Sequence, residues 1–544
     1  MTSSKSDTAM ATQPATSDAP HPENFGLFLL ALALLFNAIL VAPELRIERA
    51  PVNDLPFHIG AAQVLGHSIA HGEPFMDPWV SQWSLGFPLW RIYQPLPHLL
   101  AAGVIALCHP FASAAASFAA LYYLLLVLVP ASTYLGTRLL GLSPIAAGLA
   151  SILILAPNEM GDLGRYGLSY GAYLWRGSGL YTELVALQVM LIALGLVSRA
   201  IDAGRQQTAA AIALALTALC HVFFGYVAFV SIAVWALAGP SEGRAQRLAR
   251  TASIAARAML LLAWFIIPMM MVSGEVNRSR WEPSYKFDSY GAAFILRQLV
   301  SGNLLDFGRA PVLTLMAALG ALIAVFKIND SLARRLLVLV LVWLALFFGR
   351  ETWGYLLYFA GIPSQFHVHR LEAAFELFVV LIAGWGLERV IAAALRAPAL
   401  IAMAAGVVLG AAILVLAMER AEFLRLNTMW GEKNLAAFER ERGDLDAALA
   451  DIRAIITERP GRVSAGKAED WGWTFKIGDA HVYDFLSSNA IDQASYLFHT
   501  IPVSSDYMVL RSENNPAQED FFAVRAVLAP ITLRLPSNFK RRST

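Results

Sequence analysis

Long, nearly uninterrupted apolar runs constrain this chain more than any other feature of its sequence. The clearest runs cover residues 25–42, 114–136, 143–157, 180–198, 258–272, 311–326, 335–349, 371–388 and 399–418. Several of them approach the roughly 20 residues that a helix needs to cross a bilayer. A membrane β-barrel would show short alternating segments instead. We therefore predict an α-helical polytopic membrane protein with about 10–12 spans.

The composition agrees with this prediction. The chain is 57% hydrophobic and only 15% charged, whereas a soluble domain usually carries about a quarter charged residues. A net charge of +1 gives no reason to expect a nucleic-acid partner. Cys108 and Cys220 lie in or beside apolar runs, which excludes a disulfide framework. Residues 1–22 are polar and rich in Ser, Thr, Ala and Pro, and we predict a disordered tail there.

Basic loops predict the orientation of the spans. The basic clusters lie at 199–205, 244–257, 327–335 and 389–396, and we place them in the cytoplasm. Keeping the first two on one side requires 208–238 to be a short hairpin, with His221 near its outer turn. A first loop at about 44–95 and everything after 418 then lie outside. Counting spans back to the first one agrees with this orientation only if residues 95–108 dip into the membrane or lie flat on it rather than cross it.

The composition changes after Met418. Residues 432–457 are charged and helical in period, whereas "GWTFKIGDAHVYDFL" and "FFAVRAVLAP" indicate short strands separated by turns. We therefore divide the chain into a transmembrane domain at 23–419 and a small extracytoplasmic α/β domain at 420–544. The second domain ends abruptly, and we expect it to be a shortened version of a fuller domain.

The segment Asn53–His71, which follows the first apolar run, predicts a helix. Asn53 or Asp54 suits the N-cap, and Pro56 falls in the first turn, where its missing N–H does no harm. His58 projects with the apolar face, one turn after Asp54. We expect these two side chains to form a pair that points toward whatever packs on the helix. The apolar face consists of Leu55, Ile59, Ala62, Leu65 and Ile69.

The polar residues of this helix each allow a structural and a functional interpretation. His67 and His71 have the i,i+4 spacing that suits a metal. No third ligand stands nearby in sequence, so we expect them to face water together with Gln63. Asp54 is either a plain helix cap or a carboxylate with a chemical role. A cap alone needs no histidine on its inner side, and Ser or Thr would cap as well.

The loop that follows is rich in aromatic residues and punctuated by prolines. Trp79, Trp83, Trp90 and Tyr93 suit a membrane interface. An aromatic belt does not explain a long polar loop inserted before the next span. We expect this loop to wall off a cavity at the membrane surface.

At these motifs the sequence resembles the integral-membrane glycosyltransferases of the GT-C superfamily. It is most similar to the large bacterial group labelled membrane proteins related to 6-pyruvoyl-tetrahydropterin synthase. The resemblance covers most of the chain, and the order of its short motifs carries it. The motifs are "DLPFH", "SLGFPLWRIYQPLPHLLA", "YLWRGSGLYTE", "CHVFFG", "SQFHVHRLEAAFEL", "GRVSAG" and "LFHTIPVSSDYMVLRSENNPAQEDFFAVRAVLAP".

The resemblance implies an enzyme that takes a sugar from a polyprenyl-phosphate carrier and passes it to an extracytoplasmic glycan, lipid or protein acceptor. It implies a bacterial cytoplasmic (inner) membrane location. Such chemistry needs a base for the acceptor and cations for the phosphate. Our candidate base is Asp54, with His58 as its partner. Arg370, which follows His367 and His369 in the sequence, is the best candidate for a phosphate ligand. Weaker alternatives are Arg176, Arg278 and Arg280, and the candidate substrate-binding residues also include Glu183, His221, Asp77 and Tyr93.

Several of these residues have a structural alternative. Arg370 alternatively anchors a helix end in the headgroup region, and Arg176 alternatively pairs with Glu183 across a helix face. No cofactor is implied with certainty. A divalent metal would need a second carboxylate near Asp54, and Asp77 is the one close in sequence.

Two other functions stay open from the sequence. One is a polytopic transporter or a flippase for lipid-linked sugars. Transporters tend to carry repeated halves and charges at mid-membrane, whereas here the polar features cluster in outer loops. The other is a non-catalytic scaffold that assists envelope assembly through its outer domain.

Overall fold

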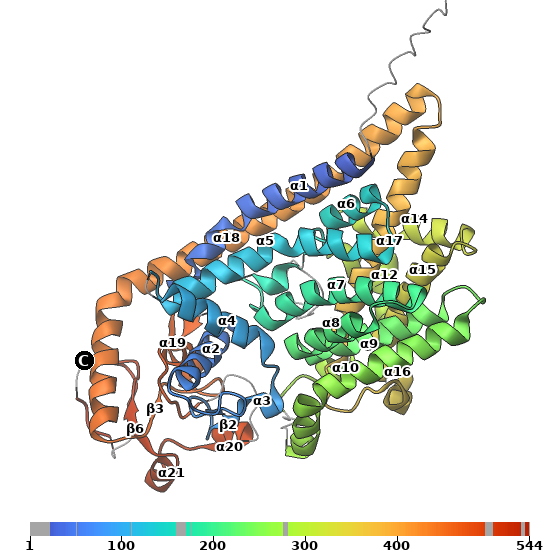
Figure 1. Ribbon diagram of the computed structural model, residues 1–544. Helices are drawn as coiled ribbons and strands as arrows, with labels where there is room; N and C mark the ends of the chain where they lie inside the picture. Colours follow the sequence, from blue (N-terminus) through green and yellow to red (C-terminus); the bar gives the residue numbers. More distant parts are fainter. Residues whose placement is uncertain are drawn as a thin grey trace, which may run out of the picture.

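The computed structural model describes residues 22–49, 52–109, 111–158, 170–174, 176–275, 281–495, 504–534 and 539–542. All but the last residue of the predicted tail, as well as Arg278 and Arg280, lie outside the described residues. Figure 1 shows a bundle of long helices with a smaller mixed unit at one end.

The predicted apolar runs all form helices. These are α1 (Pro22–Leu40), α5 (Ala114–Leu140), α6 (Pro144–Leu153), α7 (Tyr181–Ala203), α10 (Arg244–Val272), α14 (Val312–Phe326), α15 (Ser331–Phe347), α17 (Leu371–Ala394) and α18 (Ala399–Glu458). In the described chain, six helices are long and apolar enough to cross a membrane. A seventh span results if α15 and the segment Arg350–Ala360, bent by 79°, count as one. Five shorter apolar helices accompany them. The chain is a polytopic helical membrane protein.

The predicted basic clusters meet at one end of the bundle, which we call the basic end. Arg335 pairs with Asp202 at 2.7 Å and donates to the carbonyl of Trp235 at 3.1 Å. Arg250 donates to the carbonyl of Ile201 at 2.8 Å. Three loops from separate parts of the sequence therefore lie together, as the orientation rule requires.

Residues 208–238 form the predicted hairpin. Helices α8 (Gln207–Cys220) and α9 (Val222–Leu237) pack on each other and on α7, and the extended backbone of His221 separates them. A Cβ on Gly225 would lie 2.6 Å from that of Ala218, so the turn closes tightly. Arg257 donates to Thr208 at the start of α8, and Trp235 near the end of α9 binds Arg335. Both hairpin ends thus lie at the basic end, and His221 lies far from it.

The short helix α4 (Leu96–Cys108) begins and ends on the same side of the bundle. At the basic end, Arg138 near the end of α5 contacts Glu23 at the start of α1 at 3.3 Å. At the opposite end, which we call the loop end, Tyr123 of α5 donates to the carbonyl of Ala38 of α1 at 3.1 Å. Since the chain leaves α1 and enters α5 at the loop end, α4 does not cross.

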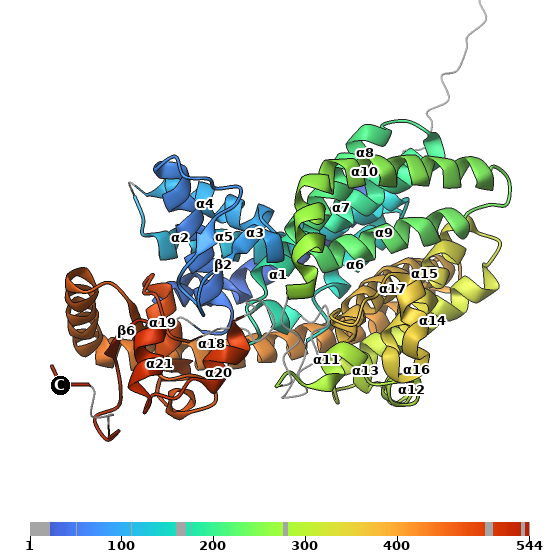
Figure 2. The same ribbon diagram turned by 90° about the horizontal axis from the view of Figure 1, so that it is seen from below.

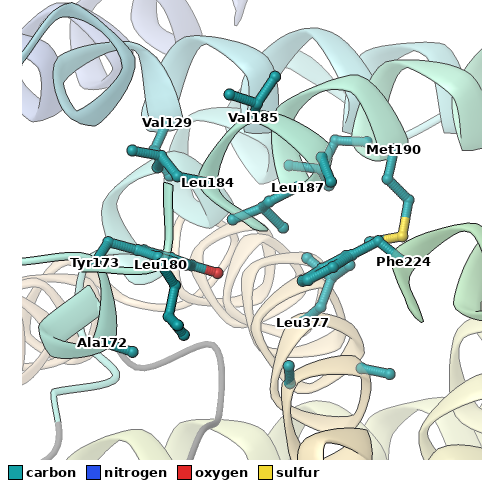
Figure 3. Close-up of a cluster of buried hydrophobic side chains, with 14 of the residues drawn as sticks. Val129, Ala172, Tyr173, Leu180, Leu184, Val185, Leu187, Met190, Phe224 and Leu377 are labelled. Carbon is teal, nitrogen blue, oxygen red and sulfur yellow. The ribbon is translucent and has the colours of Figure 1, made fainter. Parts of the chain in front are cut away.

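Close helix packing holds the bundle together. Gly195 of α7 lies against α5, where a Cβ would come within 2.3 Å of Leu139 and 2.9 Å of the carbonyl of Gly136. Small residues at such crossings let helix backbones approach closely. Figure 3 shows the adjoining core, in which Leu184, Leu187 and Phe224 interdigitate between α7, α9 and α17.

Helix α18 runs through the predicted domain boundary without a break. Its 60 residues begin as an apolar segment at the basic end, pass along α1 and continue as the charged helix predicted at 432–457 (Figure 1). Composition marks where the helix changes surroundings, at about residue 419, but the backbone is continuous there. One helix therefore connects the membrane bundle to the C-terminal unit.

The C-terminal unit is a small mixed α/β structure. Strand β3 (Arg462–Ser464) pairs in parallel with β6 (Val524–Val527), and β4 (Lys476–Ile477) forms a hairpin with β5 (Ala480–His481). Strands β4, β5 and β6 lie where the sequence predicted them. The remaining elements are η6 (Trp471–Trp473), α19 (Val482–Ser488), α20 (Ser505–Leu510) and α21 (Pro516–Phe521).

The first loop packs on this C-terminal unit (Figure 2). The loop contains η1 (Ala42–Arg49), α2 (Leu55–Ala70), β1 (Trp79–Val80), β2 (Phe87–Pro88) and α3 (Leu89–Ile92). Helix α19 contacts α2. The backbone N–H of Ser84 donates to Ser495 O at 2.7 Å, and that of Gln493 donates to Gln82 O at 3.0 Å. The two parts therefore lie on the same side of the membrane.

Trp83 is the main anchor between the two parts. It is 2% exposed, lies 5.2 Å from the ring of Phe57, and donates through Nε1 to Ser487 Oγ at 2.9 Å. We expect Trp83→Ala to lower the free energy of unfolding by about 3–5 kcal/mol, because a large buried ring is lost and a cavity remains. Thermal unfolding in detergent measures this. Trp473→Ala, at a 53% exposed position, is the control. A change below about 1 kcal/mol for Trp83→Ala would mean that the two parts dock without this side chain.

Candidate functional site

A cavity of about 500 Å³ lies at the loop end of the bundle. It is built where several chain segments meet: the start of α2, the stretch after α3, the start of α7, the α8–α9 turn, the end of α10, and the stretches around α11 (Ser284–Asp288) and before α17. The lining includes Asn53, Asp54, Ile92, Tyr93, Gln94, Ser178, Leu180, His221, Val222, Phe223, Met269, Glu282, Lys286, Gln365, Phe366, His367 and Arg370.

Asp54 enters this cavity from the N-cap position of α2. Its side chain makes no capping hydrogen bond, although a cap was one of its two expected roles. The backbone holds it in place: Asp54 N donates to Ser178 O at 3.2 Å, and Asn53, at a φ of +55°, donates through its amide to Gly177 O. The carboxylate is thus fixed by its neighbours and left available to the cavity.

The surroundings of Asp54 make it a stronger base than an ordinary aspartate. Burial raises its pKa to about 7, and the cation of Arg370 opposes this shift. The neighbouring carboxylates of Glu183 and Asp484 raise the pKa further, whereas Lys286 lowers it. A carboxyl group with a pKa near the working pH is suited to general acid–base chemistry.

Arg370 lines the same cavity from the end of η5 (Val368–Arg370), directly before α17. Its guanidinium forms an ion pair with Glu183 near the start of α7. Glu183 is 3% exposed and also faces His221, whose Nε2 lies 3.6 Å from its Oε1. Three residues that the sequence singled out separately therefore form one polar group on the cavity wall. The alternative in which Glu183 pairs with Arg176 is not the one found, because Arg370 takes that place.

Lys286 and Glu282 complete the charged lining, and the sequence analysis missed both. They form an ion pair one helical turn apart, with Lys286 Nζ 2.5 Å from Glu282 Oε2. Neither residue stands out in sequence, since the short helix α11 follows no motif. His367 lies beside them, and burial, followed by the charges of Arg370 and Lys286, lowers its pKa to about 3. It therefore stays neutral at ordinary pH.

Tyr93 lines the cavity from the stretch after α3. Its hydroxyl lies 3.3 Å from Thr182 Oγ1, to which Gln94 also donates at 3.0 Å. Both contacts connect the first loop to the start of α7. The predicted cavity behind the aromatic loop is present, and this loop forms one of its walls.

His58 and His369 support the cavity rather than line it. His58 is 1% exposed, and its Nδ1 lies 3.1 Å from Nε2 of His98. The predicted pair of His58 with Asp54 is replaced by a pair of His58 with His98 on α4. His369 is 1% exposed and its Nδ1 lies 2.8 Å from the carbonyl of Lys286, which ties η5 to α11.

Asp77 and Arg176 lie outside the cavity lining. Arg91 donates through Nε to Asp77 Oδ1 at 2.9 Å, and this pair is half exposed. Arg176 is exposed, and its backbone N–H donates to Asn427 Oδ1 at 2.9 Å. Asp77 therefore does not supply the second carboxylate that a metal beside Asp54 would need. Within the described ranges, no three His, Cys, Asp or Glu side chains gather as metal ligands.

The arrangement can perform a specific kind of chemistry. The lining offers a basic carboxylate, two cations, and apolar side chains from α3, α9 and α10. Such a site can deprotonate one polar reactant and neutralise an anion carried by an amphipathic one.

Comparison with solved structures identifies the fold. The chain is similar to the oligosaccharyltransferase AglB from Archaeoglobus fulgidus in complex with an inhibitory peptide and a dolichol-phosphate. The TM-score is 0.55 at 11% identity, and the match covers 93% of this chain and 69% of that one. The apo form of the A. fulgidus oligosaccharyltransferase gives a TM-score of 0.55 at 12% identity, with 92% and 69% covered. ArnT from Cupriavidus metallidurans bound to undecaprenyl phosphate gives 0.46 at 13% identity, with 92% and 89% covered.

No family model matches the sequence, and no curated protein sequence matches it. At these identities the structural likeness establishes the fold and not the activity. The predicted GT-C fold is confirmed. The narrower bacterial group stays a prediction.

Proposed function

We propose that this chain, whose membrane domain has the GT-C fold, transfers a sugar from a polyprenyl-phosphate carrier to an acceptor hydroxyl or amide. One observation carries the proposal. Asp54, whose side chain makes no capping hydrogen bond and whose pKa is raised to about 7, shares a single cavity with Arg370 and Lys286. A transporter or a scaffold needs no such pairing of a base with cations at a membrane surface. AglB was solved with a dolichol-phosphate, which supports a lipid-phosphate ligand for this fold.

Asp54 acts as the general base in this proposal. The acceptor oxygen or nitrogen attacks the anomeric carbon of the donor sugar, and its proton passes to the Asp54 carboxylate. The bond between that carbon and the phosphate oxygen breaks, and its electron pair stays on the departing polyprenyl phosphate. A positioned base typically contributes about 10²–10⁴ in rate. His58 acts only as a positioning residue, through the packing of α2 on α4.

Arg370 and Lys286 neutralise the phosphate as it leaves. Both currently face carboxylates, Glu183 and Glu282 respectively, so each cation is already desolvated and oriented. His221 and His367 border the same space as hydrogen-bonding groups, and His367 is neutral there. Cations placed beforehand at a developing charge cost no reorganisation during the reaction.

The polyprenyl chain lies against the apolar wall of the cavity. Ile92, Val222, Phe223, Met269 and Phe366 supply this wall, and Met269 belongs to a membrane-spanning helix whose surface is largely apolar. The first loop and the C-terminal unit lie outside the cytoplasm in this proposal. The arginines at the opposite end of the bundle support that orientation, because cytoplasmic loops carry an excess of Lys and Arg.

The proposal is tested by the lipid fraction of a strain that lacks the gene. We expect a polyprenyl-phosphate-linked sugar to accumulate, together with loss of its product from the envelope, and the wild-type gene to reverse both. If solute uptake or export changes while no lipid-linked sugar accumulates, a transporter is the better explanation.

The rate of transfer should depend on pH through Asp54. The base is active when deprotonated, so kcat/KM should rise with pH through an apparent pKa of about 7 and fall tenfold per unit below it. His367, with a pKa of about 3, should not contribute in this range. Initial rates of polyprenyl phosphate release from about pH 5 to about pH 8, where protein stability tends to be greatest, measure the profile. A profile that is flat around pH 7 would contradict the assignment of Asp54.

A further inference from the structure

A second polar groove lies along α2, between the first loop and the C-terminal unit. Its volume is about 600 Å³, and its lining comes from α2, the β1 region, α18 and the end of α19. None of its lining residues borders the Asp54 cavity. Asp54 and His67 are thirteen residues apart, which places the groove about 20 Å along the axis of α2 from the carboxylate.

Trp79 provides a flat aromatic surface at this groove. Trp79 is 62% exposed and lies against the backbone of Gly86. A Cβ at Gly86 would approach Nε1 of Trp79 within 2.4 Å, and the φ of +86° also favours glycine there. The indole therefore lies against Gly86 through Nε1, Cε2 and Cζ2, while most of Trp79 stays exposed at the groove. A rigid aromatic ring of this kind offers apolar contact area at little entropic cost.

The groove also holds buried polar atoms that lack partners. Oε1 of Gln63 and Oε1 of Gln82 are both buried and have no hydrogen-bond partner among the described residues, and Gln82 is only 6% exposed. A buried polar atom without a partner costs free energy. Both residues line the groove. The two oxygens themselves are covered by protein, and that of Gln82 lies against Gly60 of α2, so a ligand would meet the rest of these side chains.

The remaining lining indicates the chemistry of that ligand. Asp492 and Glu73 supply acceptors, whereas Arg453 and His67 supply donors. Two carboxylates disfavour a polyanion, and the scarcity of apolar side chains disfavours a lipid or an apolar peptide anchor. Neutral hydroxyl groups both donate and accept, and a sugar ring presents a flat C–H face to an aromatic ring.

We propose that this groove binds a neutral oligosaccharide. The assignment rests on the proposed function in one respect, namely that the bound glycan is the acceptor. Its growing end then reaches Asp54, while its earlier sugar units lie on Trp79. Glycan binding can be measured without transfer, so the two proposals fail separately.

The test is calorimetric titration of the full-length protein in nanodiscs. The probes are soluble neutral gluco-, manno-, galacto- and arabino-oligosaccharides. We expect at least one series to bind, and Trp79→Ala to weaken its binding about tenfold or more. Gln63→Leu should weaken it as well. Because Trp79 is largely exposed, its variant should keep the unfolding temperature of the wild type.

Two controls separate this site from others. Trp473→Ala removes an exposed tryptophan of the C-terminal unit that does not line the groove, and it should leave binding unchanged. In the Asp54→Asn background, where transfer is lost, Trp79→Ala should still weaken binding by the same factor as in the wild type. The inference is overturned if no series binds, if Trp79→Ala binds as well as the wild type, or if the groove binds a polyanion or a peptide instead.

Discussion

Replacement of Asp54 by Asn should reduce sugar transfer by about 10²–10⁴-fold while the protein stays folded. The substitution keeps the shape of the side chain and removes the base. The raised pKa shows that the folded state disfavours the charged carboxylate. Ionisation of Asp54 therefore lowers the free energy of unfolding. This loss begins above the ordinary pKa of an aspartate and grows until about pH 7. The Asn variant should be at least as stable as the wild type above pH 7.

Asp77→Asn is the matched control, because it makes the same chemical change in the same loop. Asp77 is half exposed, is paired with Arg91, and lies outside the cavity. We expect it to restore product and clear accumulated lipid-linked sugar in the deletion strain, whereas Asp54→Asn should not. If Asp54→Asn restores normal product at normal expression, Asp54 is not the base.

The second large effect concerns Arg370. Arg370→Gln should reduce transfer by about 10²–10³-fold, because a preorganised cation at the leaving phosphate is lost. It should also lower the free energy of unfolding by about 3–5 kcal/mol, because the carboxylate of Glu183 is left buried without its partner. Two causes therefore combine in one variant, and a second substitution must separate them.

The double variant Arg370→Gln with Glu183→Gln provides that separation. It removes both charges of the buried pair, so much of the stability should return. Activity should remain lost if Arg370 acts on the phosphate, and should return if Arg370 only anchors Glu183. Arg425→Gln is a surface control, since its pair with Glu422 is half exposed and should contribute less than about 1 kcal/mol. Steady-state kinetics and thermal unfolding of the purified variants measure both effects.

Local patterns in the sequence were sufficient for the secondary structure of the membrane domain. Every predicted apolar run became a helix, because the bilayer requires backbone hydrogen bonds to be satisfied within the segment. The basic clusters predicted the hairpin around His221 and the helix at 96–108 that does not cross. The N-cap position of Asp54 followed from the local sequence of Asn53–Pro56.

Local patterns could not supply the partners of these residues. Glu183 seemed a natural partner for Arg176, yet Arg370, 187 residues away, takes that place. His58 was expected beside Asp54 and instead lies against His98. Helical periodicity gives the face from which a side chain projects, but it does not give the element that packs there.

The sequence by itself determined that this chain crosses a membrane many times and that a polar loop follows its first span. Hydropathy and charge act on each segment separately, so these properties could be read from the residues in order. Only the tertiary structure decided that Asp54, Arg370 and Lys286 border one cavity, and that Trp79 and Gln63 border another. These residues meet because helices distant in sequence pack together, and the pKa of Asp54 is a consequence of that packing.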